Sequence, residues 1–257
     1  MSLGSFGRTY IVLMILGVVA GCSTAKKPSP DASLSASLPT ERVAKAEPAL
    51  GQKMHVFFEE TMRARDALVD GDVASARQSL GKLASISFDG TSMPAGWAPE
   101  LARWRAMARI GSQSQQLEEV AVSVSQMGAQ CGRCHQTLGK GPKYEASGWV
   151  EDTEDLGAHM FLLMWASDRM WEGLTEPWDR AWQVGAQTLV EAPIKMKALG
   201  KKLGPRAARA REYAQALKKA GETALLEEDP ASRADGFANV LLTCASCHSA
   251  VRKTSAP

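Results

Sequence analysis

Residues 131–135 read Cys-Gly-Arg-Cys-His, and residues 244–248 read Cys-Ala-Ser-Cys-His. Cys-x-x-Cys-His is the attachment sequence of c-type haem, in which both thiols form thioethers with the haem and the histidine binds the iron. On a helix, positions i, i+3 and i+4 share one face, so both sulfurs and the imidazole reach the same side. The sequence therefore predicts two covalently attached c-type haems, with these ligating residues: Cys131, Cys134, Cys244 and Cys247 for the thioethers, and His135 and His248 for the iron.

Two other interpretations of the cysteine pairs fit less well. A single four-thiolate zinc site would have to join pairs that stand 113 residues apart (244 minus 131), and it would not need the histidine that follows each pair. A thioredoxin-like redox pair would need a preceding strand and a βαβ context, and no strand pattern precedes either motif.

The fifth cysteine, Cys22, follows a short apolar segment near the N-terminus. Arg8 and the apolar run 10–20 match the n- and h-regions of a signal peptide, because the run is too short to span a bilayer stably. Val19-Ala20-Gly21-Cys22 resembles a bacterial lipobox, which implies cleavage before Cys22 and its lipidation. An ordinary secretory signal with a chance cysteine is the alternative. We expect a lipid-anchored protein on the periplasmic side of a bacterial membrane, and Ser23 suggests the outer membrane by analogy with Gram-negative sorting.

The remaining sequence predicts an all-α fold of two tandem four-helix bundles, each with Cys-x-x-Cys-His on its last helix. Apolar residues recur every three or four positions, and no strand alternation occurs. A segment rich in Ser, Ala and Pro reads as a flexible tether. The expected boundaries are a signal peptide at 1–21, the tether at 22–47, and haem domains at 48–142 and 151–257.

The two expected bundles align on their first helices as well as on their motifs. His55-Val-Phe-Phe matches His159-Met-Phe-Leu at a separation of 104 residues (159 minus 55), against 113 at the motifs. We assign the difference of nine mainly to an insert around Pro193. The segment 175–177, Thr-Glu-Pro, has the residues of a helix start and is expected to begin the second helix of the second bundle.

His55 and His159 are the only histidines outside the motifs, and each falls on the first helix of its repeat. The matching positions predict bis-histidine ligation, His55 with His135 and His159 with His248. The alternative is that both are core or edge histidines beside five-coordinate haems. Methionine is a rival sixth ligand, and three methionines on these helices are candidates: Met54, Met62 and Met160.

Four helices with Cys-x-x-Cys-His near the end of the last one resemble class II c-type cytochromes, the cytochrome c-prime and c-556 group. The resemblance covers residues 48–138 and 153–251 and rests on motif position and helix count. It implies two haem-binding four-helix bundles. The first repeat is short for that family, and its leading helix carries a histidine where the family has methionine, leucine or another apolar residue.

These features predict a membrane-anchored dihaem cytochrome that passes single electrons between a redox donor and an acceptor. It would be an electron carrier and not an enzyme, although it could be a subunit of a larger oxidoreductase, and bis-histidine ligation implies low-potential haems. The alternative is a five-coordinate haem protein of the cytochrome c-prime type that binds gases or small ligands. A dihaem peroxidase fits less well. A net charge of +2 argues against a nucleic-acid partner.

A basic segment is the candidate partner surface of the second repeat. Between Lys195 and Lys219 the chain has nine lysines and arginines against one acidic residue, Glu212. This charge could steer an acidic redox partner towards the second haem. The alternative is an ordinary solvated helix face.

Overall fold

The computed structural model describes residues 47–87, 96–139, 141–144, 155–192 and 196–252. All of them belong to one compact unit, Glu41–Pro257, which contains both expected haem domains. The predicted signal peptide, Cys22 and all but the last residue of the tether lie outside the described residues. None of the described helices combines the length and the apolar character needed to cross a membrane.

The prediction of an all-helical chain is confirmed for the described residues, which contain no strand. The first half comprises α1 (Glu47–Val69), α2 (Val73–Ser85), α3 (Trp97–Gln113) and α4 (Leu117–Leu138). The second half comprises α5 (Leu156–Thr175), α6 (Asp179–Glu191), α7 (Met196–Leu203), a 3-10 turn (Gly204–Arg206), α8 (Ala207–Ala224) and α9 (Pro230–Val251).

Helix ends follow the local signals in most places. Asp72 caps α2 by accepting a hydrogen bond from the Ser75 N–H at 3.0 Å, and Asp229 caps α9 just before Pro230. The expected helix start at 175–177 is wrong, because Thr175 is the last residue of α5 and α6 begins at Asp179. The Thr175 hydroxyl donates to the Trp171 carbonyl at 3.0 Å, a bond made from inside a helix and not from its cap.

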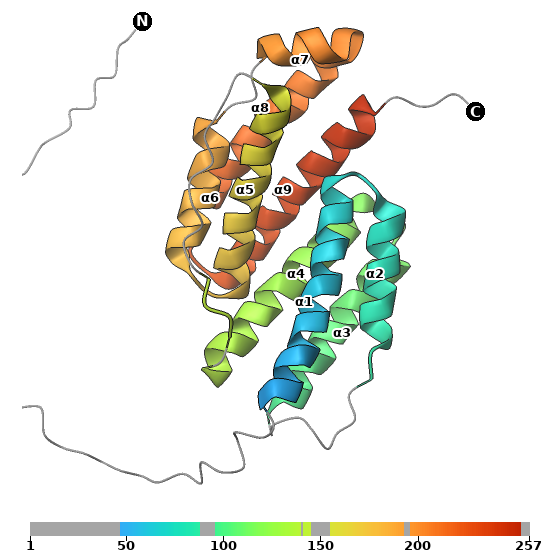
Figure 1. Ribbon diagram of the computed structural model, residues 1–257, viewed down its shortest axis with the longest axis vertical. Helices are drawn as coiled ribbons and strands as arrows, with labels where there is room; N and C mark the ends of the chain where they lie inside the picture. The colour runs from blue at the N-terminus through green and yellow to red at the C-terminus, as the bar shows by residue number, and fades with distance from the viewer. Residues whose placement is uncertain (1–46, 88–95, 140, 145–154, 193–195, 253–257) are drawn as a thin grey trace, which may run out of the picture. The chain divides into compact units, whose positions relative to one another are not determined.

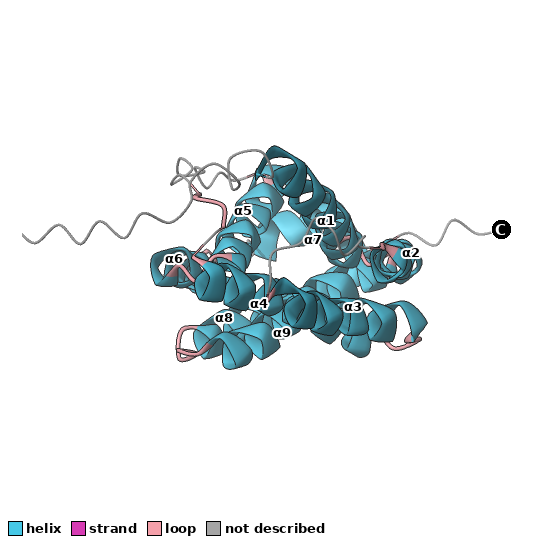
Figure 2. Ribbon diagram, turned by 90° about the horizontal axis from the view of Figure 1, so that it is seen from below, coloured by secondary structure: helices cyan, strands magenta, loops and turns pink. Residues whose placement is uncertain are grey.

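Helices that follow one another in sequence pack against one another within each half. α1 packs on α2, α2 on α3 and α3 on α4; α5 packs on α6, α6 on α8 and α8 on α9. The halves meet along α4 and α9, which run side by side through the centre of Figure 1 and lie between the two groups of helices in the end view of Figure 2. α1 also contacts α9, and α4 contacts α5. The last helix of each half is thus covered by the first helix of the other half.

The buried positions repeat between the halves, and they correct the separation expected from the sequence. Every buried residue of α1 has a buried counterpart on α5 at a separation of 106 residues, from Phe57 with Leu163 to Val69 with Thr175 (175 minus 69). α3 and α4 match α8 and α9 at 113, as Trp104 with Leu217 (217 minus 104). The insert is therefore seven residues (113 minus 106), and α7 accompanies it.

Candidate functional site

Both Cys-x-x-Cys-His motifs lie in the last turns of long helices, as the sequence predicts. Cys131, Cys134 and His135 end α4, and Cys244, Cys247 and His248 end α9. All four cysteines are free thiols and are partly buried. Each motif thus presents two thiols and one imidazole within five residues on one helix, the arrangement that covalent haem attachment requires.

Burial keeps the first cysteine of each motif neutral. It raises the pKa of Cys131 to about 12, with a smaller contribution from Cys134 and an opposing one from the Trp104 indole N–H. Burial likewise raises the pKa of Cys244 to about 12, which Cys247 reinforces and the Arg65 guanidinium opposes. Nucleophilic or metal-binding thiols need a lowered pKa. These thiols therefore differ from reactive cysteines of redox enzymes.

Each motif histidine donates a hydrogen bond to a main-chain carbonyl of the other half. The His135 Nδ1 atom lies 2.9 Å from the carbonyl oxygen of Thr175, the last residue of α5. His248 Nδ1 makes the same contact with the carbonyl of Val69, the last residue of α1. A carbonyl can only accept, so Nδ1 carries the proton and Nε2 is the nitrogen available to a metal. Such a partner fixes the tautomer and orients a ligating imidazole.

A predominantly apolar cleft lies beside the second motif. Its cavity volume is about 90 Å³, which is below the roughly 300–1,000 Å³ of small-molecule and cofactor sites. Cys244, Cys247 and His248 line one side of it. The other walls come from the end of α1, from α5, from Leu189 of α6 and from α8; the α5 and α8 residues are Met160, Leu163, Met164, Ser167, Tyr213 and Leu217.

The corresponding space in the first half contains larger aromatic groups. Trp104 stands where the second half has Leu217, and Phe57 stands where it has Leu163. Their rings meet edge to face with centroids 5.2 Å apart. Glu100, one turn before Trp104, accepts a hydrogen bond from Gln130, the residue that precedes Cys131. α3 thus brings an indole and a carboxylate to the first motif.

The two histidines expected as sixth ligands lie in different environments. His55 is on the surface, with 70% of its side chain exposed, and its Nδ1 atom is 3.1 Å from the Glu59 carboxylate. His159 is fully buried and is not among the described residues that line the cleft. At the separation of 106 the counterpart of His55 is Phe161 and that of Met54 is Met160. Of the three methionine candidates, Met160 is the one that lines the cleft.

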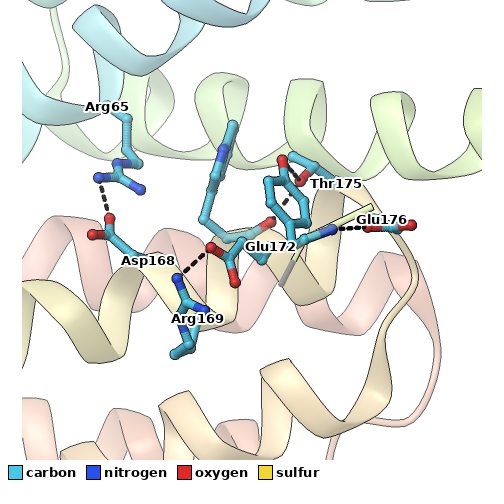
Figure 3. Close-up of polar contacts among 8 residues, drawn as sticks. Arg65, Asp168, Arg169, Glu172, Thr175 and Glu176 are labelled. Carbon is cyan, nitrogen blue, oxygen red and sulfur yellow. Dashed lines mark hydrogen bonds and ion pairs between the residues drawn. The ribbon is translucent and has the colours of Figure 1, made fainter. Parts of the chain in front are cut away.

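A group of charged side chains occupies the junction between the halves. Arg65 of α1 pairs with Asp168 of α5 at 2.5 Å and with Asp66 at 2.9 Å. Arg169, the next residue of α5 after Asp168, pairs with Glu172 one turn further along (Figure 3). The Arg65 guanidinium also lies 6.0 Å from the centre of the Trp171 ring. Burial is the largest cause that raises the pKa of Glu172 to about 7. The Arg65–Asp168 pair joins the first helices of the two halves.

The basic segment of the second half lies on α7 and α8, beside the cleft. Lys201, Lys202, Arg209, Arg211, Lys218 and Lys219 are exposed, whereas Arg206 is half-buried and donates to the carbonyl of Val251 at the end of α9. Lys195 lies outside the described residues. Tyr213 and Leu217, between these residues on α8, line the cleft. The positive charge therefore belongs to the helix that forms one wall of the second site.

The cysteine pairs do not converge with other ligands into a metal-ion site. Within the ranges that the structure describes, no three side chains of His, Cys, Asp or Glu come together as ligands. The arrangement required for a four-thiolate zinc site, with both pairs around one ion, is therefore not formed by these helices.

Comparisons of the chain with protein-family models, with curated proteins and with solved structures found no match.

Some site residues have no signal in the sequence. The carbonyls of Val69 and Thr175 act through the main chain, so side-chain identity says nothing about them. Trp104 and Glu100 lie on α3 among ordinary helical residues, and only the packing of α3 on α4 places them at the motif. The tryptophan content, seven residues in 257, is the one compositional hint.

Proposed function

We propose that the protein is a dihaem c-type cytochrome built from two tandem four-helix haem-binding bundles, and that it carries single electrons between redox partners. The observation that carries this proposal is which ring nitrogen of each motif histidine is left free to bind iron. Each has its Nδ1 proton fixed by a carbonyl, so that Nε2 remains for iron on the same helix turn as two thiols. At the second motif this turn borders an apolar cleft.

The two thiols and one imidazole of each motif are the donor set that a covalently bound haem needs. Cys131 with Cys134 and Cys244 with Cys247 would hold the two groups, and His135 and His248 would be the ligands on the helix side. A bound haem supplies a one-electron iron couple. The protein's own part is to exclude water with the apolar walls from α5, α6 and α8 and to hold each imidazole in one orientation through the carbonyls of Thr175 and Val69.

The bis-histidine ligation by His55 and His159 stays a prediction, and the register of the halves supports a methionine alternative. Met54 and Met160 are equivalent at the separation of 106, and Met160 already borders the space beside His248. Spectra of the oxidised protein separate the two. Methionine ligation gives a sulfur-to-iron band in the far red that Met160→Ala removes from the second site, whereas histidine ligation leaves this variant unchanged and makes His159→Ala high-spin.

Haem content tests the proposal directly. We expect two haems per chain in protein matured with a c-type haem attachment system, and one haem in the double variant Cys131→Ala/Cys134→Ala. The matched variant Cys244→Ala/Cys247→Ala should retain the other haem. Haem staining of denatured protein detects covalent attachment in each case. A protein that carries no covalent haem, or an unchanged stoichiometry in both variants, would refute the assignment.

We further propose that lipidated Cys22 tethers the cytochrome to a bacterial membrane on its periplasmic side, in the outer membrane by the analogy drawn from Ser23. The lipobox-like sequence supports this. Cys22→Ala should release the protein from membranes without changing its haem content. Retention of this variant in the membrane fraction would contradict the anchor.

An acidic redox protein is the partner that the basic face of α7 and α8 favours. Electron transfer to such a partner should become slower at high salt. The variants Lys218→Gln and Lys219→Gln should make this salt dependence smaller.

A five-coordinate, ligand-binding haem protein is the second candidate, and one observation favours it. The Ser167 hydroxyl is buried beside the cleft, and no described group accepts or donates a hydrogen bond to it. A small ligand bound at the second site would offer it a partner. Stoichiometric binding of carbon monoxide by the reduced wild type would support this candidate, and absence of binding would support the six-coordinate electron carrier.

A further inference from the structure

The two candidate haem sites have the same backbone surroundings but different charges. The equivalences at 106 and 113 residues pair each residue near one motif with a residue near the other. Most pairs keep a similar character: the carbonyls of Thr175 and Val69 face the histidines, and the acidic residues Glu176 and Asp70 follow them. Several pairs place a charged residue opposite a neutral one, and two of these charges, the buried Arg65 and the half-buried Glu100, lie beside a motif.

The first unmatched charge is Arg65, beside the second motif. It lies one turn before Val69, whose carbonyl accepts the hydrogen bond from His248, so α1 lays Arg65 along α9 towards Cys244. Its positive charge lowers the pKa of Cys244, against the larger rise caused by burial. The counterpart of Arg65 is the neutral Trp171, which lies against α4 so closely that its ring would touch a side chain at Gly128, one turn before Cys131.

The acidic partners of Arg65 neutralise it incompletely at that position. Only 4% of the Arg65 side chain is exposed, compared with 39% for Asp168 and 51% for Asp66. Solvent screens the carboxylates more strongly than the buried guanidinium. Consistently, Arg65 is the charged residue outside the motif that acts on Cys244.

The second unmatched charge is Glu100, beside the first motif. Hydrogen bonds from Arg103 and Gln130 lower its pKa and keep it ionised. Its negative charge adds to the burial that raises the pKa of Cys134. The counterpart of Glu100 at 113 residues is Tyr213, a neutral residue that lines the second cleft.

Three further charges near the motifs do not reverse this difference. Arg103 pairs with Glu100 at 2.5 Å, but 53% of its side chain is exposed against 18% for Glu100, so solvent screens the guanidinium more strongly than the carboxylate. Arg133 lies within the first motif where the second has Ser246, but it is exposed and adjoins the Glu100 carboxylate. Arg252 lies one turn after His248 and donates to the carbonyl of Asp70, whereas its counterpart is Gly139. The second site is therefore the more positive of the two.

We propose that Arg65 and Glu100 make the two haem sites electrostatically unequal, so that the haem at the second motif has the higher midpoint potential and the haem at the first motif the lower. A nearby positive charge favours the reduced form of the iron, which has one positive charge fewer, and a negative charge favours the oxidised form. A single electron shared by the two sites is then held at the second. This inference rests on the proposed dihaem function.

Potentiometric titration of the two-haem protein, followed by absorbance, tests the inference. We expect two one-electron steps in the wild type. The single-haem variants Cys131→Ala/Cys134→Ala and Cys244→Ala/Cys247→Ala assign the higher step to the second motif and the lower to the first. Equal potentials, or the reverse order in the single-haem variants, would overturn the proposal. A protein without haem would show no step at all, so failure of the proposed function is recognised separately.

Charge variants then test the cause. Arg65→Gln should lower only the higher potential, by up to about a tenfold change in the equilibrium constant, or about 59 mV for a one-electron couple. Glu100→Gln should raise only the lower potential. Arg65→Lys keeps the charge and should leave both potentials in place even if it loosens packing, and the neighbouring Arg63→Gln, 59% exposed, is the matched control. A shift in Arg65→Lys as large as in Arg65→Gln, or an equal shift in Arg63→Gln, would contradict the assignment.

Discussion

The first site is filled by aromatic rings where the second is open, although the same positions build both. Phe57 and Trp104 pack together beside the first motif, whereas Leu163 and Leu217 line the cleft beside the second. The two members of each pair are buried to similar extents, with 7% and 8% exposed for Phe57 and Leu163 and 4% and 6% for Trp104 and Leu217. At these positions the duplication preserves burial, and side-chain size is the property in which the halves differ.

The comparison also shows that neither half is self-sufficient. His135 of the first half depends on a carbonyl of α5, and His248 of the second half depends on a carbonyl of α1. Both carbonyls belong to the last residue of a helix, where the main chain has unused acceptors. Each half therefore supplies a terminal group that orients the other half's histidine.

The largest effect is expected from truncating Trp104, an aromatic residue beside the first motif. Trp104 is almost fully buried in the first half, and Trp104→Ala should lower the free energy of unfolding by about 3–5 kcal/mol because it removes buried area and leaves a cavity. Leu217→Ala, at the equivalent position, should cost less because Leu217 borders an open cleft. Denaturant unfolding of both variants checks this, and equal losses would show that the two sites are equally filled.

The close approach of α4 to α5 gives the next largest effect. A side-chain carbon at Gly132 would collide with the main-chain carbonyl of Leu174, which cannot move aside as a flexible side chain can. Gly132→Ala should therefore destabilise the fold by about 1–3 kcal/mol. The second motif has Ala245 at the equivalent position, and the main-chain carbonyl of Ala245 lies near Gly71, whose φ is 74°.

A matched control separates this collision from the general effect of alanine in a helix. Gly51 of α1 has no atom within 4 Å of the corresponding position, so Gly51→Ala should stabilise α1 by about 0.5–1 kcal/mol. If Gly132→Ala stabilised the protein as well, the close contact between α4 and Leu174 would be wrong.

The sequence predicted what depends on periodicity and on local chemistry. The apolar stripe that leads into each motif placed Cys131 and Cys244 on the last helices, and Asp72 and Asp229 marked helix starts. The equivalence of His55 and His159 is a different kind of inference, because it rests on the similarity of two four-residue segments and not on periodicity. Helical burial has a period near 3.6, so an error of two residues turns a side chain to another face of the helix.

The parts that could not be predicted are those that arise only when the helices pack. Trp171 and Arg65 are equivalent residues, yet they also contact each other across the junction. No local pattern in either helix indicates such a contact. The same holds for Glu172, whose burial comes from the packing around α5 and from no feature of its own sequence neighbourhood.

The second half should also be the more pH-sensitive one. Glu172 has a pKa raised to about 7 by burial, with Asp168 adding to the rise and Arg169 opposing it, whereas its counterpart in the first half is the half-exposed Asp66. An unfolded glutamate ionises near 4.5, so the folded state binds more protons between pH 4.5 and about 7. Stability should therefore fall as the pH rises through this window and level off above it.

Glu172→Gln should flatten that dependence, as measured by thermal unfolding at a series of pH values. Glu227, also in the second half, has a pKa raised to about 7 by burial and by Asp235, so the double variant with Glu227→Gln should be flatter still. Glu118→Gln, on the exposed first turn of α4, is the control and should follow the wild type. A slope that survives in the double variant would assign the pH dependence to other groups.

The smallest expected effect compares the starts of α2 and α6. Asp72 caps α2 and also accepts the Ser75 hydroxyl at 2.7 Å, whereas α6 begins after Trp178, its counterpart at 106 residues (178 minus 72), with no side-chain cap. Asp72→Ala makes the two starts alike and should cost about 1 kcal/mol, or a fall in Tm of about 2–4 °C for a chain of this size. Asp72→Asn keeps an acceptor and should retain most of the stability.

The hydrogen bonds from Ser75 hold the pKa of Asp72 below its usual value. The ionised cap therefore contributes to stability at neutral pH, and this contribution is lost as the pH falls through that lowered pKa. The difference in Tm between wild type and Asp72→Ala should accordingly shrink in acid; a difference that stayed constant down to pH 2 would mean that the aspartate stabilises α2 by some means other than its ionised carboxylate.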